Sequence, residues 1–266
     1  MKRIALTLVA LAVATPALAQ DDEPRFCPNR PSLGSSACTT EPGRVQFEFS
    51  AFDWQLDDTA DQREDQVVAA DLLARIGLGP TTEVQVGWTA FGHVRTRDKA
   101  TGGIDTVNGT GDVTLALRQN FRNPDGKGLS FGIQPQVTLP VGSRDVGDGD
   151  WSAGVLLPVT YDLSDKLNLQ FTGEADAAAN EDGNGQHLAY SGIWGLGYDI
   201  SDKLTAVAEL SLERDNDPAG HQSHSLAALS LAYTPRKTLQ LDVLAVAGLN
   251  RTSPDVRLVT GGAVLF

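Results

Sequence analysis

A serine and histidine cluster is the part of this sequence whose residue types come closest to a catalytic group. Its members are His221, Ser223, His224 and Ser225. A serine nucleophile needs an imidazole base in a fixed geometry and a third group that orients this base. Pro218 and Gly220 instead predict a mobile loop around the cluster. We therefore predict no catalytic site here, and we expect His93 and His187, near strand ends, to be exposed loop residues rather than ligands.

A short acidic run has residue types that could bind a divalent cation. Asp145, Asp148 and Asp150 alternate with Gly147 and Gly149, and carboxylate oxygens are ligands that Ca²⁺ prefers. The spacing departs from that of an EF-hand loop, and an acidic, solvated loop explains it equally well. We predict no metal site and no cofactor, and bridging to lipopolysaccharide through divalent ions stays open as an alternative.

Ten charged side chains occupy the polar positions of segments in which apolar and polar residues alternate. They are Glu48, Asp71, Arg75, Glu83, Arg118, Glu174, Asp176, Glu209, Asp242 and Arg257. If the apolar positions face lipid, these side chains line a lumen, where seven carboxylates and three guanidiniums favour cations over anions. The alternative is that they pair with one another and plug a narrow barrel.

Such a lumen requires strands, and the sequence uses one hairpin twice. Tyr161–Leu167 recurs as Tyr198–Leu204, each copy with a Ser-Asp-Lys turn between two alternating runs. A period of two is typical of β-strands. The flanking runs are about nine to eleven residues long, the length that a tilted strand needs to cross a membrane. A soluble β-sandwich, the alternative fold, usually has strands of about five or six residues.

Twelve such runs follow one another from Arg44 onward. They are predicted at residues 45–51, 68–76, 84–90, 112–118, 129–139, 153–163, 167–175, 188–198, 204–210, 229–233, 239–247 and 256–266. Short connections alternate with longer ones, among them polar loops at Gln55–Gln66 and Arg95–Gly111. Because Pro135 has no N–H to donate, we expect a bulge there. An even number of strands, joined alternately by short and by longer connections, is typical of an outer-membrane barrel.

Aromatic residues indicate the same architecture. Phe121, Tyr161, Tyr198 and Tyr233 all precede short turns, which would place them in one ring at the periplasmic interface. Phe266 ends the last run and resembles the C-terminal signal that outer-membrane proteins present to the barrel-assembly machinery. The sequence therefore predicts an all-β fold over residues 44–266, a transmembrane antiparallel β-barrel of 12 strands in an up-and-down meander.

The residues before this barrel predict export. Lys2 and Arg3 precede an apolar run that ends at an Ala-x-Ala site, which predicts a signal peptide over residues 1–19. An N-terminal membrane anchor is the alternative, but the run is too short to span a bilayer. Residues 20–43 are expected to form a periplasmic segment in which Cys27 and Cys38 make a disulfide, because exported thiols are normally oxidised. Without the two cations of the signal peptide, 19 Lys and Arg face 34 Asp and Glu, and the net charge of −15 disfavours nucleic acid as a partner.

Two short segments resemble a known family. Gly111–Leu115 and Pro135–Ser143, together with the signal peptide and the terminal Phe, resemble the outer-membrane barrel family labelled as a transporter of the MetA phenol-degradation pathway. The resemblance covers about residues 44–266, and Val141 departs from the hydroxyl residue expected before Gly142. It implies passage of small compounds, including aromatic or hydrophobic ones.

These features together predict a non-enzymatic channel or transporter for small molecules in the outer membrane of a Gram-negative cell, in contact with membrane lipid and lipopolysaccharide. A closed structural or adhesion barrel that acts through its external loops is the competing class. An enzyme is a further class, because twelve-stranded phospholipases exist in this membrane. An open lumen with ordered charge would favour the channel, and a fully paired, filled lumen would favour the closed barrel.

Overall fold

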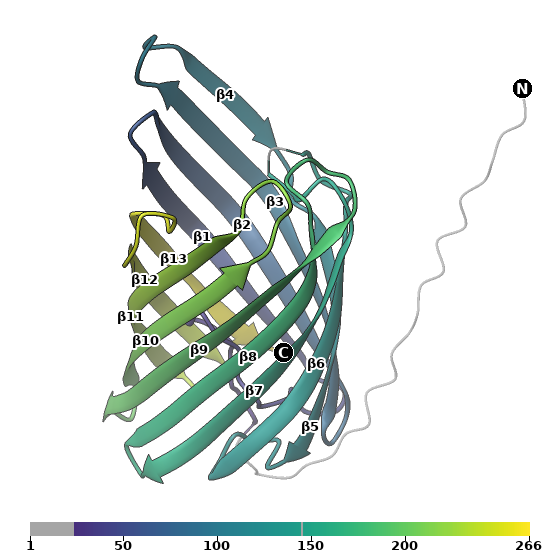
Figure 1. Cartoon of the computed structure of the whole chain (residues 1–266). Coiled ribbons are helices and arrows are strands. Elements are labelled where there is room, and N and C mark those ends of the chain that lie inside the picture. Colours follow the sequence, from purple (N-terminus) through teal and green to yellow (C-terminus); the bar gives the residue numbers. More distant parts are fainter. Residues whose placement is uncertain (1–23, 145) are drawn as a thin grey trace, which may run out of the picture.

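Thirteen β-strands form one antiparallel sheet in the computed structural model, which describes residues 24–144 and 146–266. The predicted signal peptide lies outside the described residues. Strands that are consecutive in the chain pair with each other, except that β5 pairs with β3 rather than β4, and the sheet curls into a barrel (Figure 1). The strands are β1 (Val45–Asp58), β2 (Gln62–Gly79), β3 (Thr82–Asp98), β4 (Ile104–Gly109), β5 (Val113–Arg122), β6 (Leu129–Leu139), β7 (Ser152–Ser164), β8 (Leu167–Ala179), β9 (Gln186–Ser201), β10 (Leu204–Asp215), β11 (Gln222–Arg236), β12 (Leu239–Gly248) and β13 (Val256–Leu265).

The barrel closes between its first and last strands. β1 pairs with β13 along its length, from Gln46 opposite Leu265 to Leu56 opposite Val256. β4 and β5 together fill one place beside β3, because β4 pairs with the far half of β3 and β5 with its near half. Thirteen segments thus make twelve barrel strands, which confirms the predicted up-and-down meander. No helix among the described residues has the length and apolar content needed to cross a membrane.

The two faces of the sheet have opposite chemistry. Large apolar side chains such as Trp88, Leu157 and Leu229 are exposed on the outer surface. Arg75, Glu83 and Arg118 are fully buried on the inner one, each with no accessible surface. A soluble protein buries apolar groups and exposes charge. The inverted pattern is that of a barrel whose outer face contacts lipid.

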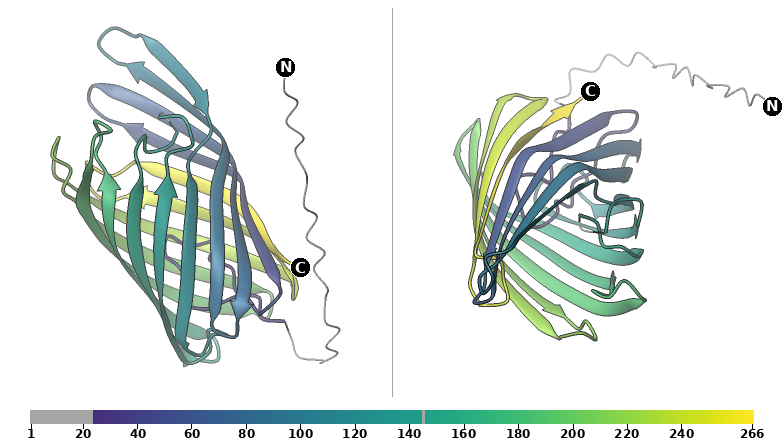
Figure 2. Two further views of the ribbon diagram at one scale, coloured as in Figure 1. Left: turned by 90° about the vertical axis from the view of Figure 1, so that its right-hand side faces the viewer. Right: turned by 90° about the horizontal axis from the view of Figure 1, so that it is seen from above.

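The two ends of the barrel differ in their connections, as predicted, but two predicted loops are largely strand. The turns at Gly79–Thr82, Ser164–Leu167, Ser201–Leu204 and Arg236–Leu239 mark one end. At the other end, the segments predicted as loops at 55–66 and 95–111 mostly continue β1, β2, β3 and β4. Only residues 59–61, 99–103 and 110–112 lie between strands there. These hairpins project beyond the rest of the barrel (Figures 1 and 2). Their ladders form despite charged side chains because backbone groups, not side chains, make the strand pairing.

Irregularities in the strands also differ from expectation. The register of β5 and β6 is the same on both sides of Pro135, with Ala116 opposite Gln136 and Gln119 opposite Ile133, so the predicted bulge there is wrong. A bulge instead interrupts β1 between Ser50 and Phe52. It shifts the alternation by one residue. The following inward side chain is consequently Asp53, which is 6% exposed.

The segment before β1 lies inside the barrel rather than outside it. Residues 24–43, hereafter the plug, run through the lumen toward the end with the short turns, where they appear purple in Figure 1. The plug joins the wall through a parallel bridge between Pro42 and Gly77. Two backbone hydrogen bonds flank this bridge, from Gly43 N–H to the Gly77 carbonyl (2.9 Å) and from Gly77 N–H to the Arg44 carbonyl (3.1 Å).

Substitution of Gly77 tests whether the close contact between the plug and β2 contributes to stability. A Cβ added to Gly77 would overlap with the carbonyl group of Glu41, whereas one added to Gly79 would first meet Thr82 at 3.9 Å. We expect Gly77→Ala to lower the free energy of unfolding by about 1–3 kcal/mol because the backbone must shift. The matched control Gly79→Ala should change it by less than about 1 kcal/mol. Urea unfolding in detergent, followed by tryptophan fluorescence, measures both; equal midpoints would contradict a close contact at Gly77.

Candidate functional site

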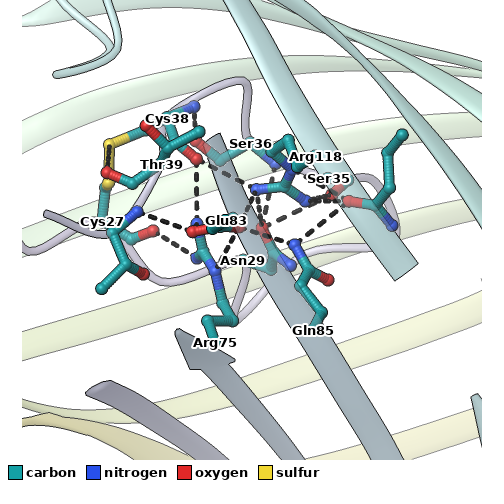
Figure 3. A network of polar contacts seen from close by, with 12 residues as sticks. Cys27, Asn29, Ser35, Ser36, Cys38, Thr39, Arg75, Glu83, Gln85 and Arg118 are labelled. Atoms are coloured by element: carbon teal, nitrogen blue, oxygen red, sulfur yellow. Dashed lines mark hydrogen bonds and ion pairs between the residues drawn. A yellow bond between two sulfur atoms is a disulfide. The ribbon is translucent and has the colours of Figure 1, made fainter. Parts of the chain in front are cut away.

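Two arginines of the barrel wall hold the plug at the ends of its disulfide loop (Figure 3). Arg75 on β2 donates from Nη1 to the Cys27 carbonyl (2.8 Å) and from Nη2 to the Cys38 carbonyl (2.9 Å). Arg118 on β5 donates from Nη1 to the same Cys38 carbonyl (3.0 Å) and from Nη2 to Ser35 Oγ. A disulfide joins Cys27 and Cys38. The two guanidiniums thus fix both ends of one covalently closed loop.

Two carboxylates compensate these buried guanidiniums and also bind the plug. Glu83 on β3 accepts from Arg75 Nε at 2.9 Å, and Glu48 on β1 accepts from Arg75 Nη1 at 3.1 Å. Glu83 also accepts the N–H of Thr40 (2.6 Å). Glu48 accepts the N–H of Asn29 at 3.1 Å. Buried charges are stable only when paired and saturated with hydrogen bonds. The plug backbone therefore completes the solvation of these charges.

Further contacts carry the plug across the lumen to the opposite wall. Arg30 reaches β12, where its Nη2 lies 2.8 Å from Asp242 Oδ1. Ser32 Oγ donates to Glu209 Oε1 on β10 at 2.6 Å. Ser35 N–H donates to Thr172 Oγ1 on β8 at 2.9 Å. β12 is only two strands from β1, but β8 and β10 lie on the far side of the barrel from β1, β2 and β3, so the plug crosses the lumen.

Two of the cavities in the lumen meet at Gln136 and Glu174, which line both. The inner cavity, of about 240 Å³, lies against the plug and combines aliphatic side chains with amides. Its lining includes Leu33, Leu73, Gln85, Gln134, Leu156 and Ile193. The outer cavity, of about 390 Å³, lies toward the long loops and is strongly acidic. Its carboxylates are Asp148, Glu174, Asp176, Glu213 and Asp215.

All ten charged residues that the sequence places in the lumen face inward, but in three separate groups. Six bind the plug or the arginines that hold it: Glu48, Arg75, Glu83, Arg118, Glu209 and Asp242. Glu174 and Asp176 line the outer cavity. Asp71 accepts from Thr89 Oγ1 at 2.9 Å, and Arg257 binds Asp53 through Nη2 at 2.5 Å. The lumen therefore contains both paired and unpaired charge.

Several residues of this site are missed by sequence reasoning. Asn29 and Arg30 belong to the plug, which has no periodic pattern to indicate where it lies; their position between the two cysteines is the one available signal. Asp53 is missed because the β1 bulge shifts the alternation of inward and outward side chains by one residue, so that Asp53 points inward. Glu213 and Asp215, in the outer cavity, continue the inward positions of β10 beyond Glu209 and could have been found from that alternation.

The residues proposed for the membrane interface and for assembly are all on the outer surface. Phe121, Tyr161, Tyr198 and Tyr233 are between 47% and 59% exposed and lie close to the short turns. Phe266 follows β13 and is 70% exposed. Its backbone N–H donates to the Val45 carbonyl at 2.9 Å. The last residue therefore completes the pairing that closes the barrel.

The serine and histidine cluster lies mainly in a strand, not in the predicted loop. Ser223, His224 and Ser225 belong to β11, where neighbouring side chains point to opposite faces. Ser223 Oγ accepts from Arg214 Nη1 at 3.0 Å. No hydrogen bond joins a serine and a histidine of this cluster within the described residues. This arrangement lacks the fixed base that a nucleophile requires.

The other candidate ligands also have partners in the protein. His187 was expected to be an exposed loop residue, but it lies in β9 with only 6% of its side chain exposed, and its Nε2 is 2.8 Å from Asp215 Oδ1. His93 was also expected in an exposed loop, but it lies in β3, where its Nδ1 is 2.7 Å from Asn108 Oδ1. Asp150 accepts from Gln186 Nε2 at 3.1 Å. Asp145 lies outside the described residues, and the residues that are described contain no group of three ligands able to hold a metal ion.

Comparison with known proteins agrees with this architecture. A sequence family described as "Putative MetA-pathway of phenol degradation" matches residues 29–265. Among solved structures, the translocator domain of the autotransporter NalP from Neisseria meningitidis is similar with a TM-score of 0.52 and 11% identity, over 85% of this chain and 90% of that one. The NanC porin is similar with a TM-score of 0.51 and 11% identity, over 80% and 99%. The β domain of the Bordetella autotransporter BrkA gives 0.50 and 13%, over 85% and 100%. At these identities the likeness establishes the fold. The sequence matches no curated protein.

Substitution of Arg75 tests how much the buried charge network contributes to the free energy of unfolding. Arg75→Met leaves Glu48 and Glu83 without their closest cation and two plug carbonyls without a donor. We expect the free energy of unfolding to fall by about 3–5 kcal/mol. The control Arg44→Met removes an exposed ion pair with Glu41 and should cost less than about 1 kcal/mol. Urea unfolding in detergent measures both; similar losses would show that the network at Arg75 carries no special stability.

The hydrogen bonds of Asp217 should make the stability of an external loop depend on pH. Hydrogen bonds from the N–H groups of Glu181 and Ala219 hold the pKa of Asp217 below its usual value of 3.8. A lowered folded pKa gives stability that is present above pH 3.8 and is lost as the pH falls below it. The amide hydrogen of Ala219, which Asp217 accepts, should therefore lose its protection from exchange with solvent as the pH falls through this range. In Asp217→Ala this amide should be unprotected throughout, so the ratio of the exchange rates of wild type and variant is the measurement; a ratio independent of pH would contradict the role of Asp217.

Proposed function

The chain belongs to the family described as "Putative MetA-pathway of phenol degradation", and from this premise we propose that it is a gated outer-membrane channel for small molecules. The observation that carries the proposal is the plug, which crosses the lumen through polar contacts and leaves a cavity on the path. Hydrogen bonds and ion pairs of this kind can be exchanged for contacts with water when the plug moves. In this proposal, the arrangement with the plug bound in the lumen is one state of a channel that opens by movement of the plug.

We propose small aromatic or hydrophobic compounds as the solutes. The support is the inner cavity, where four aliphatic side chains lie beside the amides of Gln85 and Gln134. Apolar walls with a few polar groups are typical of sites for small organic molecules, and about 240 Å³ is below the usual range for drug-sized ligands. The acidic outer cavity would disfavour anionic solutes at the entrance.

The proposal places the barrel in the outer membrane, with the short turns and both ends of the mature chain on the periplasmic side. The exposed apolar band and the aromatic residues near the short turns support this placement. Exposed Phe266 at the end of β13 is suited to recognition by the barrel-assembly machinery. The proposed role is non-enzymatic, and the geometry of the serine and histidine cluster, in which no histidine forms a hydrogen bond with a serine hydroxyl within the described residues, supports it.

Planar-bilayer conductance of the refolded protein tests the plug as a gate. We expect the wild type to be closed most of the time and a variant lacking residues 24–43 to show stable openings. Arg30→Gln with Ser32→Ala removes the contacts to Asp242 and Glu209 and should open more often than the wild type, even if the deletion variant fails to fold. Arg122→Gln, an exposed change on the short-turn side, is the matched control and should leave the open probability unchanged.

Ion selectivity gives a second measurement in the same bilayers. Open channels should prefer cations, and Glu174→Gln with Asp176→Asn should reduce this preference because both side chains line the outer cavity. Folded wild type and plug variants that never conduct would contradict the channel. That outcome would favour the competing function, a closed structural or adhesion barrel that acts through its external loops.

A further inference from the structure

An outward-facing group of arginines occupies the hairpins that project beyond the barrel. Arg63 on β2 lies directly opposite Arg97 on β3, and Asp65 lies opposite Arg95. These positions share the outer face with Trp54 and with Phe91, which is 46% exposed. We call Arg63, Arg95 and Arg97 the basic patch.

The opposite face of these hairpins is covered by the protein itself. The connection between β6 and β7 folds against it, so that a Cβ added to Gly92 or Gly109 would overlap with Val146 or Ser143. Ser143 N–H also donates to the Thr110 carbonyl at 2.9 Å. The basic patch therefore faces away from the lumen and toward the surroundings of the barrel.

The height of the basic patch is set by strand geometry. A tilted strand rises about 2.5 Å along the membrane normal per residue. Arg95 is 13 residues beyond Thr82, where β3 leaves its short turn, which places it roughly 30 Å from that turn. The apolar band of such a barrel is about 25 Å tall. The arginines consequently begin where the apolar band ends, at the level of the lipid headgroups.

The charges of the basic patch are not balanced within the protein. Arg63 and Arg95 share one carboxylate, Asp65, at 2.9 and 3.9 Å. Asp58, opposite Arg63 on β1, already forms an ion pair with Lys99. Arg97 is exposed and forms no ion pair within the described part of the chain. Like charges directly opposite each other on neighbouring strands are destabilising, and this occurs in a chain with a net charge of −13. An anion between Arg63 and Arg97 would remove that repulsion.

We propose that the basic patch binds the phosphate groups of lipopolysaccharide in the outer leaflet. Guanidiniums bind phosphate oxygens through paired hydrogen bonds, and the apolar surface below the patch would contact the acyl chains of the same molecule. The proposal requires the barrel to lie in the outer membrane, but it does not depend on conduction. It differs from bridging by divalent ions because the protein supplies the cations directly.

Binding of purified lipid A to the refolded protein in detergent with EDTA tests the proposal, since EDTA removes divalent bridges. We expect wild type to bind lipid A at least tenfold more tightly than dephosphorylated lipid A. Arg63→Gln with Arg97→Gln should abolish this difference, while the control Arg122→Gln with Arg236→Gln, at the opposite end of the barrel, should retain it. Heat-dependent gel migration verifies that each variant is folded.

Three results would overturn the proposal. Equal binding of the two lipids by wild type would show that phosphate is not recognised. An unchanged preference in the Arg63 and Arg97 variant would place recognition elsewhere. Full displacement of lipid A by an equal concentration of inorganic phosphate would show a general anion site and not a lipid site.

Discussion

The hydrogen-bonded charge network around Arg75 joins the plug to the barrel wall. Its guanidinium donates to Glu83, to Glu48 and to the carbonyls of Cys27 and Cys38. Moving a charge out of water costs several kcal/mol unless paired charges and hydrogen bonds replace the lost hydration. Without the plug, Arg75 would lose the Cys27 and Cys38 carbonyls as acceptors, and Glu48 and Glu83 would lose the N–H groups of Asn29 and Thr40 as donors. Each part makes the other part stable.

The barrel wall was predictable from the sequence, whereas the position of the plug was not. Along the strands, a period of two separates lipid-facing from inward-facing residues, so even Glu209 and Asp242 could be assigned to the lumen. The plug binds the wall largely through backbone groups, such as Asn29 N–H, Leu33 N–H and the Cys38 carbonyl. Every residue carries such groups, so no residue pattern marks them.

The sequence analysis missed the projecting hairpins and the β1 bulge for a different reason. Above the apolar band, both faces of a strand can contact water, so the alternation that identifies strands disappears although the backbone ladder continues. In β1 the bulge near Ala51 reverses the phase, which brings Asp53 inward to Arg257. A pattern read with a fixed period assigns every residue beyond such a bulge to the wrong face.

The contacts of the plug are widely separated along the chain. The residues that it binds on β10 and β12 follow it by 177 and 212 positions, as for Ser32 with Glu209 and Arg30 with Asp242. The disulfide, by contrast, closes over 11 positions and needs no other part of the protein. The disulfide loop can therefore form before the barrel, but its binding site is complete only after β10 and β12 have been added to the sheet. A plug that makes all of these contacts thus requires a barrel that has formed as far as β12.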